Sequence, residues 1–246
     1  MNRRLLLFMC LLPMLAAAQS PSREVLHQRF AWLRYYNKLT VSPQWQVQTE
    51  LEMRRYVSPD RLHQSVLRVN VLHQNGSLRP SMGGGATYFL QALPQLAGEE
   101  LDHVRPEIRP HQEITLHQEG TVRLSHRYKV EERFFLKSTE EEQLDFNLRL
   151  RYKVEAQFPL TESASGAGAV LLRVYDELMV NAGKKIVNNV FDQNRVYASV
   201  QLGLSDHWAA EVAYLYWFQQ RPTGFEFYSR HIGRITLTHT LTLIKS

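Results

Sequence analysis

The chain has 246 residues, with 29 Lys and Arg against 24 Asp and Glu, and its formal net charge is +5. This length suits one large β domain or two small ones, and no basic and aromatic recognition motif accompanies the modest charge, so no nucleic-acid partner is expected. The only cysteine, Cys10, lies within the first eighteen residues, which excludes disulfides and thiolate metal sites from a chain that has lost them.

The first eighteen residues have the pattern of a secretory signal peptide. Arg3 and Arg4 precede an apolar run from Leu5 to Leu12, and three alanines then offer a cleavage site before Gln19. The apolar run is too short to span a bilayer as a helix. We therefore expect a signal peptide at 1–18 and a single domain at 19–246, with a net charge of +3 after the two arginines are removed.

No later stretch approaches the roughly 20 apolar residues of a membrane helix. Apolar and polar side chains instead alternate along the chain, which places them on opposite faces of β-strands. Turn-forming residues separate many of these segments, and the longest expected loop is 92–106. Eleven segments show the alternation: 29–40, 45–56, 62–73, 82–91, 107–118, 121–134, 144–158, 169–180, 191–204, 208–219 and 230–243.

The clearest of these segments is 144–158. Leu150 and Tyr152 belong to an apolar set, whereas Arg149 and Arg151 belong to a set that is wholly polar and mostly charged. A helix would spread both sets around its circumference, so the alternation favours a strand. Soluble strands usually run about 5–6 residues and a tilted membrane-spanning strand needs about 9–11, so a strand of this length is typical of a membrane barrel.

These features predict an all-β protein, a single antiparallel transmembrane β-barrel with a polar, charged lumen. Bacterial single-chain barrels have an even number of strands, so we expect about twelve within a range of ten to twelve. The additional strand is expected near the start of the mature chain, within 22–28.

Two environments produce an apolar face on every strand: lipid around a membrane barrel, and the core of a soluble one. The long strands and the mixed charges of the polar face favour lipid. So do the aromatic residues near strand ends, namely Trp45, Tyr56, Trp208 and Phe218, because such residues form girdles at membrane interfaces. A soluble secreted ligand-binding barrel is the alternative.

The polar faces of the strands carry both signs of charge. Buried charges must be paired or hydrated, so these side chains are expected to form an ionic network that fills the lumen and fixes the strand register. The alternative is the basic wall of a narrow, anion-favouring pore, centred on Arg127, Arg149, Arg151 and Lys153. The expected lumen residues are Glu50, Glu52, Arg54, Arg68, Glu107, Arg109, Arg127, Lys129, Glu131, Arg133, Arg149, Arg151, Lys153, Glu155, Glu177 and Arg195.

Two small groups resemble metal or catalytic sites. His111 and His117 share a strand face with Glu113, but six residues of strand separate the two histidines by about 20 Å, too far to share one ion. Ser125 and His126 are adjacent and face opposite sides, so they cannot act together as nucleophile and base. No catalytic residue, metal site or cofactor is expected, and a lipid-modifying or hydrolytic barrel enzyme is the alternative function.

Several short motifs follow one another along the chain: Trp32 with Lys38 and Leu39, Trp45 with Glu50 and Arg54, Gln64 with Arg68, 126–134, 149–152, Glu177 with Asn181, and 193–197. Their order and spacing resemble an uncharacterised bacterial family, domain of unknown function 2490. The resemblance implies an outer-membrane β-barrel in a Gram-negative bacterium and brings no known activity or cofactor. The expected partners are outer-membrane lipid and the machinery that inserts barrels, and the oligomeric state stays open.

Overall fold

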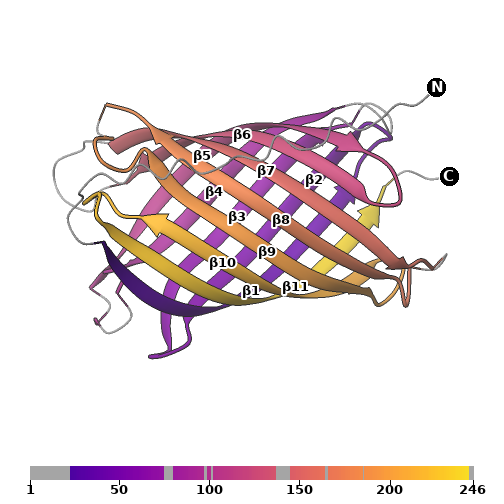
Figure 1. Ribbon diagram of the computed structural model, residues 1–246. Coiled ribbons are helices and arrows are strands. Elements are labelled where there is room, and N and C mark those ends of the chain that lie inside the picture. The colour runs from indigo at the N-terminus through magenta and orange to yellow at the C-terminus, as the bar shows by residue number, and fades with distance from the viewer. Residues whose placement is uncertain are drawn as a thin grey trace, which may run out of the picture.

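The computed structural model describes residues 23–74, 80–96, 99–100, 102–136, 145–163, 166–184 and 186–243. The expected signal peptide lies outside these residues. The described part of the chain folds into one closed β-barrel of eleven strongly tilted strands (Figure 1). The all-β barrel expected from the alternation is therefore confirmed.

Eleven strands run up and down in chain order, and each of the ten consecutive pairs is antiparallel. No helix among the described residues is long and apolar enough to cross a membrane. The strands are β1 (Glu24–Thr40), β2 (Trp45–Tyr56), β3 (Arg61–His73), β4 (Ser81–Leu93), β5 (His103–Gln118), β6 (Arg123–Phe135), β7 (Asp145–Thr161), β8 (Val170–Ala182), β9 (Phe191–Gly203), β10 (Trp208–Gln220) and β11 (Glu226–Thr242).

The barrel closes through a parallel pair, β1 with β11, which runs in register over seventeen residue pairs. An odd number of strands that alternate in direction leaves the first and last strands pointing the same way, so this closure is required by the count. The strand count falls within the expected range and is one below the preferred twelve. The additional strand expected within 22–28 is instead the beginning of β1, which starts at Glu24.

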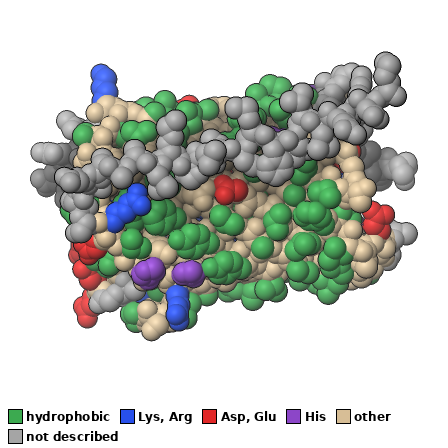
Figure 2. Space-filling view, viewed as in Figure 1, with side chains coloured by type: hydrophobic (Ala, Val, Ile, Leu, Met, Phe, Trp, Pro, Cys, Tyr) green, Lys and Arg blue, Asp and Glu red, His purple; other side chains and the backbone are tan. Residues whose placement is uncertain are grey.

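Apolar side chains cover the outside of the barrel. Figure 2 shows them spread over the viewed wall, with few charged side chains between them. A few polar pairs interrupt the outer face, among them Asn194, whose amide donates to Asp176 at 2.7 Å. Every strand contributes at least one large exposed apolar side chain: Leu33, Leu51, Leu67, Tyr88, Ile114, Tyr128, Leu150, Leu178, Val200, Val212 and Ile235.

Two β-bulges change the direction of side chains that simple alternation would place outside. In β3, Arg54 pairs with Gln64 and Arg55 with Leu62, so the skipped residue His63 turns inward beside Gln64 and is fully buried. In β9, a register shift opposite Met179 likewise turns Asp192 inward beside Gln193. An extra residue on one strand of an antiparallel pair produces this effect.

The barrel has two rims. We call the rim at which β1 begins the first rim, and the opposite one the second rim. At the first rim, Arg61 holds the loop between β4 and β5 by donating to the carbonyl oxygens of Pro94 at 2.5 Å, Leu96 at 2.9 Å and Glu99 at 2.7 Å. The sequence predicted Tyr56 in an outer aromatic girdle. This prediction is wrong, because the ring of Tyr56 is buried inside the barrel.

Candidate functional site

The lumen contains two adjoining cavities and a wider mouth. The larger cavity has a volume of about 260 Å³, the smaller one about 60 Å³, and the mouth at the first rim about 930 Å³. Both cavities are bordered by Arg54, Arg68, Arg151 and Arg195. These four arginines, which we call the arginine ring, mark the passage from one cavity to the next.

Like charges lie opposite each other on β6 and β7. Arg127 is paired in register with Lys153, and Lys129 with Arg151. Directly opposed like charges destabilise a sheet, so these four cations require carboxylates from elsewhere. The flanking strands β5 and β8 supply two of these carboxylates, and Glu155 of β7 itself binds Lys153 at 2.6 Å.

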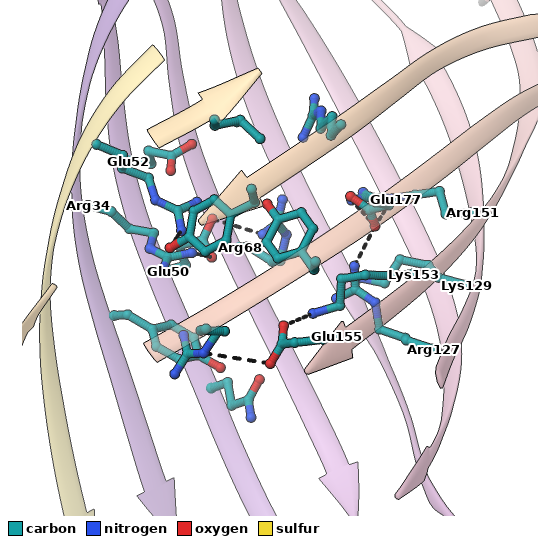
Figure 3. A pocket seen from close by; sticks show the side chains of 18 of the residues that line it. Arg34, Glu50, Glu52, Arg68, Arg127, Lys129, Arg151, Lys153, Glu155 and Glu177 are labelled. Atoms are coloured by element: carbon teal, nitrogen blue, oxygen red, sulfur yellow. Dashed lines mark hydrogen bonds and ion pairs between the residues drawn. The ribbon is translucent and has the colours of Figure 1, made fainter. Parts of the chain in front are cut away.

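Glu113 and Glu177 are the carboxylates that the flanking strands supply. Glu113 of β5 accepts from Lys129 at 2.8 Å, and Glu177 of β8 accepts from Arg127 at 2.6 Å and from Arg151 at 2.8 Å. Figure 3 shows Glu177 with Arg127 and Arg151 at its sides. The four strands are thereby connected through their side chains as well as through their backbones.

Nearer the first rim, Glu107 and Glu131 are the centres of the network. Glu107 is fully buried and binds the guanidinium groups of Arg109 at 2.6 Å and Arg133 at 2.7 Å. Glu131 binds Arg151 at 2.5 Å. Each arginine holds a carboxylate that would otherwise be an isolated buried charge, which is costly.

On the other side of the lumen, Glu50 and Glu211 each bind further arginines. Glu50 binds Arg68 at 2.8 Å, and Glu211 binds Arg173 at 2.9 Å and Arg234 at 3.3 Å. The hydroxyl of Tyr197 also donates to Glu211, at 2.6 Å. Glu211 therefore joins the ionic network to the apolar side of the lumen.

That apolar side is a cluster we call the aromatic wall. Its rings pack edge to face and beneath cations: Trp32 lies 6.1 Å from Trp217, and Arg54 lies 4.0 Å above Trp32. Such contacts hold both the rings and the guanidinium planes. The cluster comes from β1, β2, β9, β10 and β11 and consists of Phe30, Trp32, Tyr56, Tyr197, Ala213, Leu215, Trp217 and Ile232.

All sixteen residues expected in the lumen lie on strands and line its cavities or are buried beside them. Fifteen of them form ion pairs among the described residues, and Arg195 has no carboxylate partner there. The wider network adds Arg34, Arg173, Arg234, Asp192 and Glu211. The first three and Glu211 share the inward parity of their strands, so alternation alone could have found them, whereas the bulge hides Asp192.

The smaller cavity, which we call the arginine compartment, differs in composition from the larger one. Five glutamates line the larger cavity, but no carboxylate among the described residues lines the compartment. Two aromatic rings, Phe89 and Trp217, form the rest of its surface with five glutamines. The arginines that line it are Arg54, Arg68, Arg109, Arg133, Arg149, Arg151 and Arg195.

The histidines considered for metal or hydrolytic chemistry are hydrogen-bonded to amide and hydroxyl groups. His111 is hydrogen-bonded to Asn70 at 2.5 Å and His126 to the Tyr152 hydroxyl at 2.9 Å, while His117 contacts the hydroxyl of Ser81 at 3.0 Å. No carboxylate of the described residues contacts the Ser81 and His117 pair. The described chain also holds no cluster of three or more His, Cys, Asp or Glu residues suited to a metal ion.

Comparison with known proteins adds one finding. The family model described as "Protein of unknown function (DUF2490)" matches residues 30–228. The chain belongs to the DUF2490 family. Searches of the curated proteins and of the solved structures gave no match. The match begins in β1 and ends in β11, so the whole arginine compartment of this DUF2490 barrel lies inside the matched region.

Proposed function

We propose that this protein is a non-enzymatic outer-membrane β-barrel of a Gram-negative bacterium whose lumen is a narrow passage that favours anions. The barrel itself and the family of unknown function are compatible with this role. The location, the passage and its selectivity are our proposal, and each has separate support.

The outer face supports the location. All eleven strands expose large apolar side chains, and each strand has 12 or more residues. At about 3.3 Å per residue and a tilt near 40°, twelve residues rise about 30 Å, which suffices for the apolar band of a membrane barrel. Trp45 and Trp208 are exposed at the second rim, where an aromatic girdle would lie.

The charge of the lumen supports the selectivity, and it is the observation that carries the proposal. Fourteen Arg and Lys side chains line the two cavities, against nine carboxylates that line them or bind these cations. A surplus of five cations remains, and the arginine ring places four of the fourteen at the passage between the cavities. Rings of cationic side chains favour anions in pores.

The small cavities support a narrow passage and also define the competing role. The arginine compartment holds about 60 Å³, so solutes the size of sugars would not pass. A closed structural barrel is the second candidate, because the aromatic wall fills one side of the lumen. The two roles differ in whether small ions cross.

Conductance separates them. The refolded full chain, with folding verified by heat-modifiable gel mobility, would be placed in a planar bilayer under a KCl gradient. We expect small, uniform steps and a reversal potential of the sign set by chloride. Arg195→Gln should move that potential toward zero, because it removes one positive charge from the arginine ring. Among the described residues, the change leaves no carboxylate without its partner.

The matched control is Arg123→Gln, which removes the same charge near the second rim, where the side chain is half exposed. It should leave the reversal potential unchanged. Silence from a folded barrel would favour the closed structural role, and cation preference would contradict the proposal.

Location is tested separately. Leu150 is exposed on the outer face of β7, and an arginine at the bilayer midplane of a barrel costs about 2–4 kcal/mol. Leu150→Arg should therefore reduce the heat-modifiable barrel recovered in the outer-membrane fraction. Recovery of the wild type in the soluble periplasm without detergent would contradict the location.

A further inference from the structure

We propose that the arginine compartment is a binding site for one small tetrahedral oxyanion of the phosphate class. The inference deepens the proposed function by naming the anion, and it rests on that function because the anion must enter through the lumen. Three observations support it: the arginine-rich lining of the compartment, the N–H donors that have no acceptor among the described residues, and the volume of the compartment.

The carboxylates of the network hold the arginines from outside the compartment. Glu107 binds Arg109 and Arg133, yet Glu107 does not line the cavity. Stacking on aromatic rings also fixes guanidinium planes. Arg109 lies 3.8 Å from the ring centroid of Phe89, and Arg195 lies 4.6 Å from that of Trp217. The cationic groups are thus oriented before any ligand binds, which lowers the ordering cost of binding.

Several arginines of the compartment retain unused donors, and Arg133 and Arg195 have the fewest acceptors. Arg133 uses only its Nε, toward Glu107, and neither Nη atom has an acceptor among the described residues. Arg195 makes one long hydrogen bond, from Nη2 to Gln193 at 3.4 Å, and no ion pair in the described chain. A guanidinium is weakly hydrated, and its planar fork matches the oxygens of an oxyanion, so such donors suit a phosphate.

Two of the five glutamines that line the compartment add donors rather than acceptors. Arg54 donates to the side-chain oxygen of Gln64 at 2.7 Å, and Arg230 donates to that of Gln219 at 2.7 Å. Each amide oxygen is occupied, and the amide nitrogens of Gln64 and Gln219 have no acceptor among the described residues. The compartment therefore offers N–H groups to a ligand, which favours an anion with several oxygens over a cation or a neutral solute.

The volume sets the size of the ligand. At about 10–15 Å³ per water, the 60 Å³ of the compartment accommodates about four to six waters, or one tetrahedral oxyanion in their place. Once a tetrahedral oxyanion fills the compartment, no space remains within it for an organic substituent. We therefore assign the site to the free inorganic ion.

Titration calorimetry of the refolded full chain in a non-ionic detergent tests the assignment. Inorganic phosphate would be titrated at pH 8 with ionic strength held constant by KCl. We expect saturable binding of one phosphate per chain and at least tenfold weaker binding of glycerol 3-phosphate. Equal binding of the ester would overturn the assignment to a free ion, and absence of saturable binding by a folded barrel would overturn the site.

Variants locate the site. Arg195→Gln and Arg133→Gln should each weaken phosphate binding about tenfold or more, because each removes charge-assisted hydrogen bonds. Glu107 keeps Arg109 when Arg133 is replaced, so at least one of the two variants should fold. Arg123→Gln, remote from the compartment, should change the affinity by less than twofold. Equal losses in all three variants would indicate general charge attraction and overturn the site.

The two proposals fail in different ways. Saturable phosphate binding by a barrel that is silent in bilayers would refute the passage and leave the site. Anion-selective conductance without phosphate binding would refute the site and leave the passage.

Discussion

The two sides of the lumen are filled by different means. On β5 to β8, inward side chains form an ionic wall in which Glu107, Glu113, Glu131 and Glu177 bind arginines and lysines. On β9 to β11, β1 and β2, the aromatic wall fills space with rings and aliphatic groups, beside the ion pairs of Glu50 and Glu211. The ionic wall depends on the match between partners, whereas the aromatic wall depends on volume. A barrel can therefore be narrowed from one side by bulk and made selective from the other by charge.

The sharpest way to break the ionic wall is Glu107→Leu. The change leaves Arg109 and Arg133 buried without their carboxylate, and such orphaning costs about 3–5 kcal/mol. We expect the urea midpoint of the refolded barrel in micelles, followed by tryptophan fluorescence, to fall accordingly. Glu107→Gln, which keeps an acceptor oxygen, should lose less. Equal midpoints for wild type and Glu107→Leu would show that the pairs contribute no stability.

Truncating the aromatic wall tests volume instead of charge. Trp217 is buried between the guanidinium groups of Arg195 and Arg230, at 4.6 Å and 4.2 Å from its ring. Trp217→Leu should cost about 2–3 kcal/mol, below the 3–5 kcal/mol of a full truncation to alanine. It should also enlarge the conductance steps, because the side chain borders the arginine compartment. Unchanged steps would place the narrowest point elsewhere.

Tyr197→Phe tests the connection between the walls. The tyrosine hydroxyl donates to Glu211 at 2.6 Å, and its ring belongs to the aromatic wall. Removing the hydroxyl should cost about 1.5 kcal/mol, as for a hydrogen bond to a charged group, and should leave the conductance unchanged. The urea midpoint measures the first effect. A loss as large as that of Glu107→Leu would contradict the modest contribution expected of this single hydrogen bond.

The smallest effect is expected at an ion pair outside the lumen. Arg55 donates to Asp60 at 2.7 Å in the turn after β2, and this bond lowers the pKa of the Asp60 carboxyl below its usual range. Any stability from the lowered pKa is present above the ordinary value of 3.8 and is lost as the pH falls below it. The pair is exposed, so Asp60→Asn should leave the urea midpoint at pH 7 unchanged. A clear shift would show an unexpected role for this turn.

The alternation of side chains predicted the strands well because each strand has one outward and one inward face along its whole length. The segment chosen at 45–56 coincides with β2, and all sixteen residues expected in the lumen lie there. The same reasoning treated the inward-facing side chains as an ionic network. It did not predict the aromatic wall, because single strands do not reveal that Trp32, Tyr197 and Trp217 meet across the closure.

The remaining details depend on register and on local irregularity. The sequence contains no sign that His63 and Asp192 occupy bulges, since a bulge is defined by the partner strand as much as by its own. Pairing is equally hidden: Arg195 resembles the other lumen arginines in sequence, yet it alone among the sixteen expected residues lacks a carboxylate in the described structure. The arginine compartment could therefore be located only in three dimensions.

The parallel closure places the two ends of the barrel chain at opposite rims. Since β1 and β11 run in the same direction, the residue that opens β1, Glu24, and the residue that ends β11, Thr242, lie at opposite rims. If the barrel is inserted in a bilayer, tags attached beside these two positions would lie on opposite sides of it. In an even-stranded barrel, both tags would lie on the same side. A protease or an impermeant dye added from one side would then read the direction of insertion from a single doubly tagged chain.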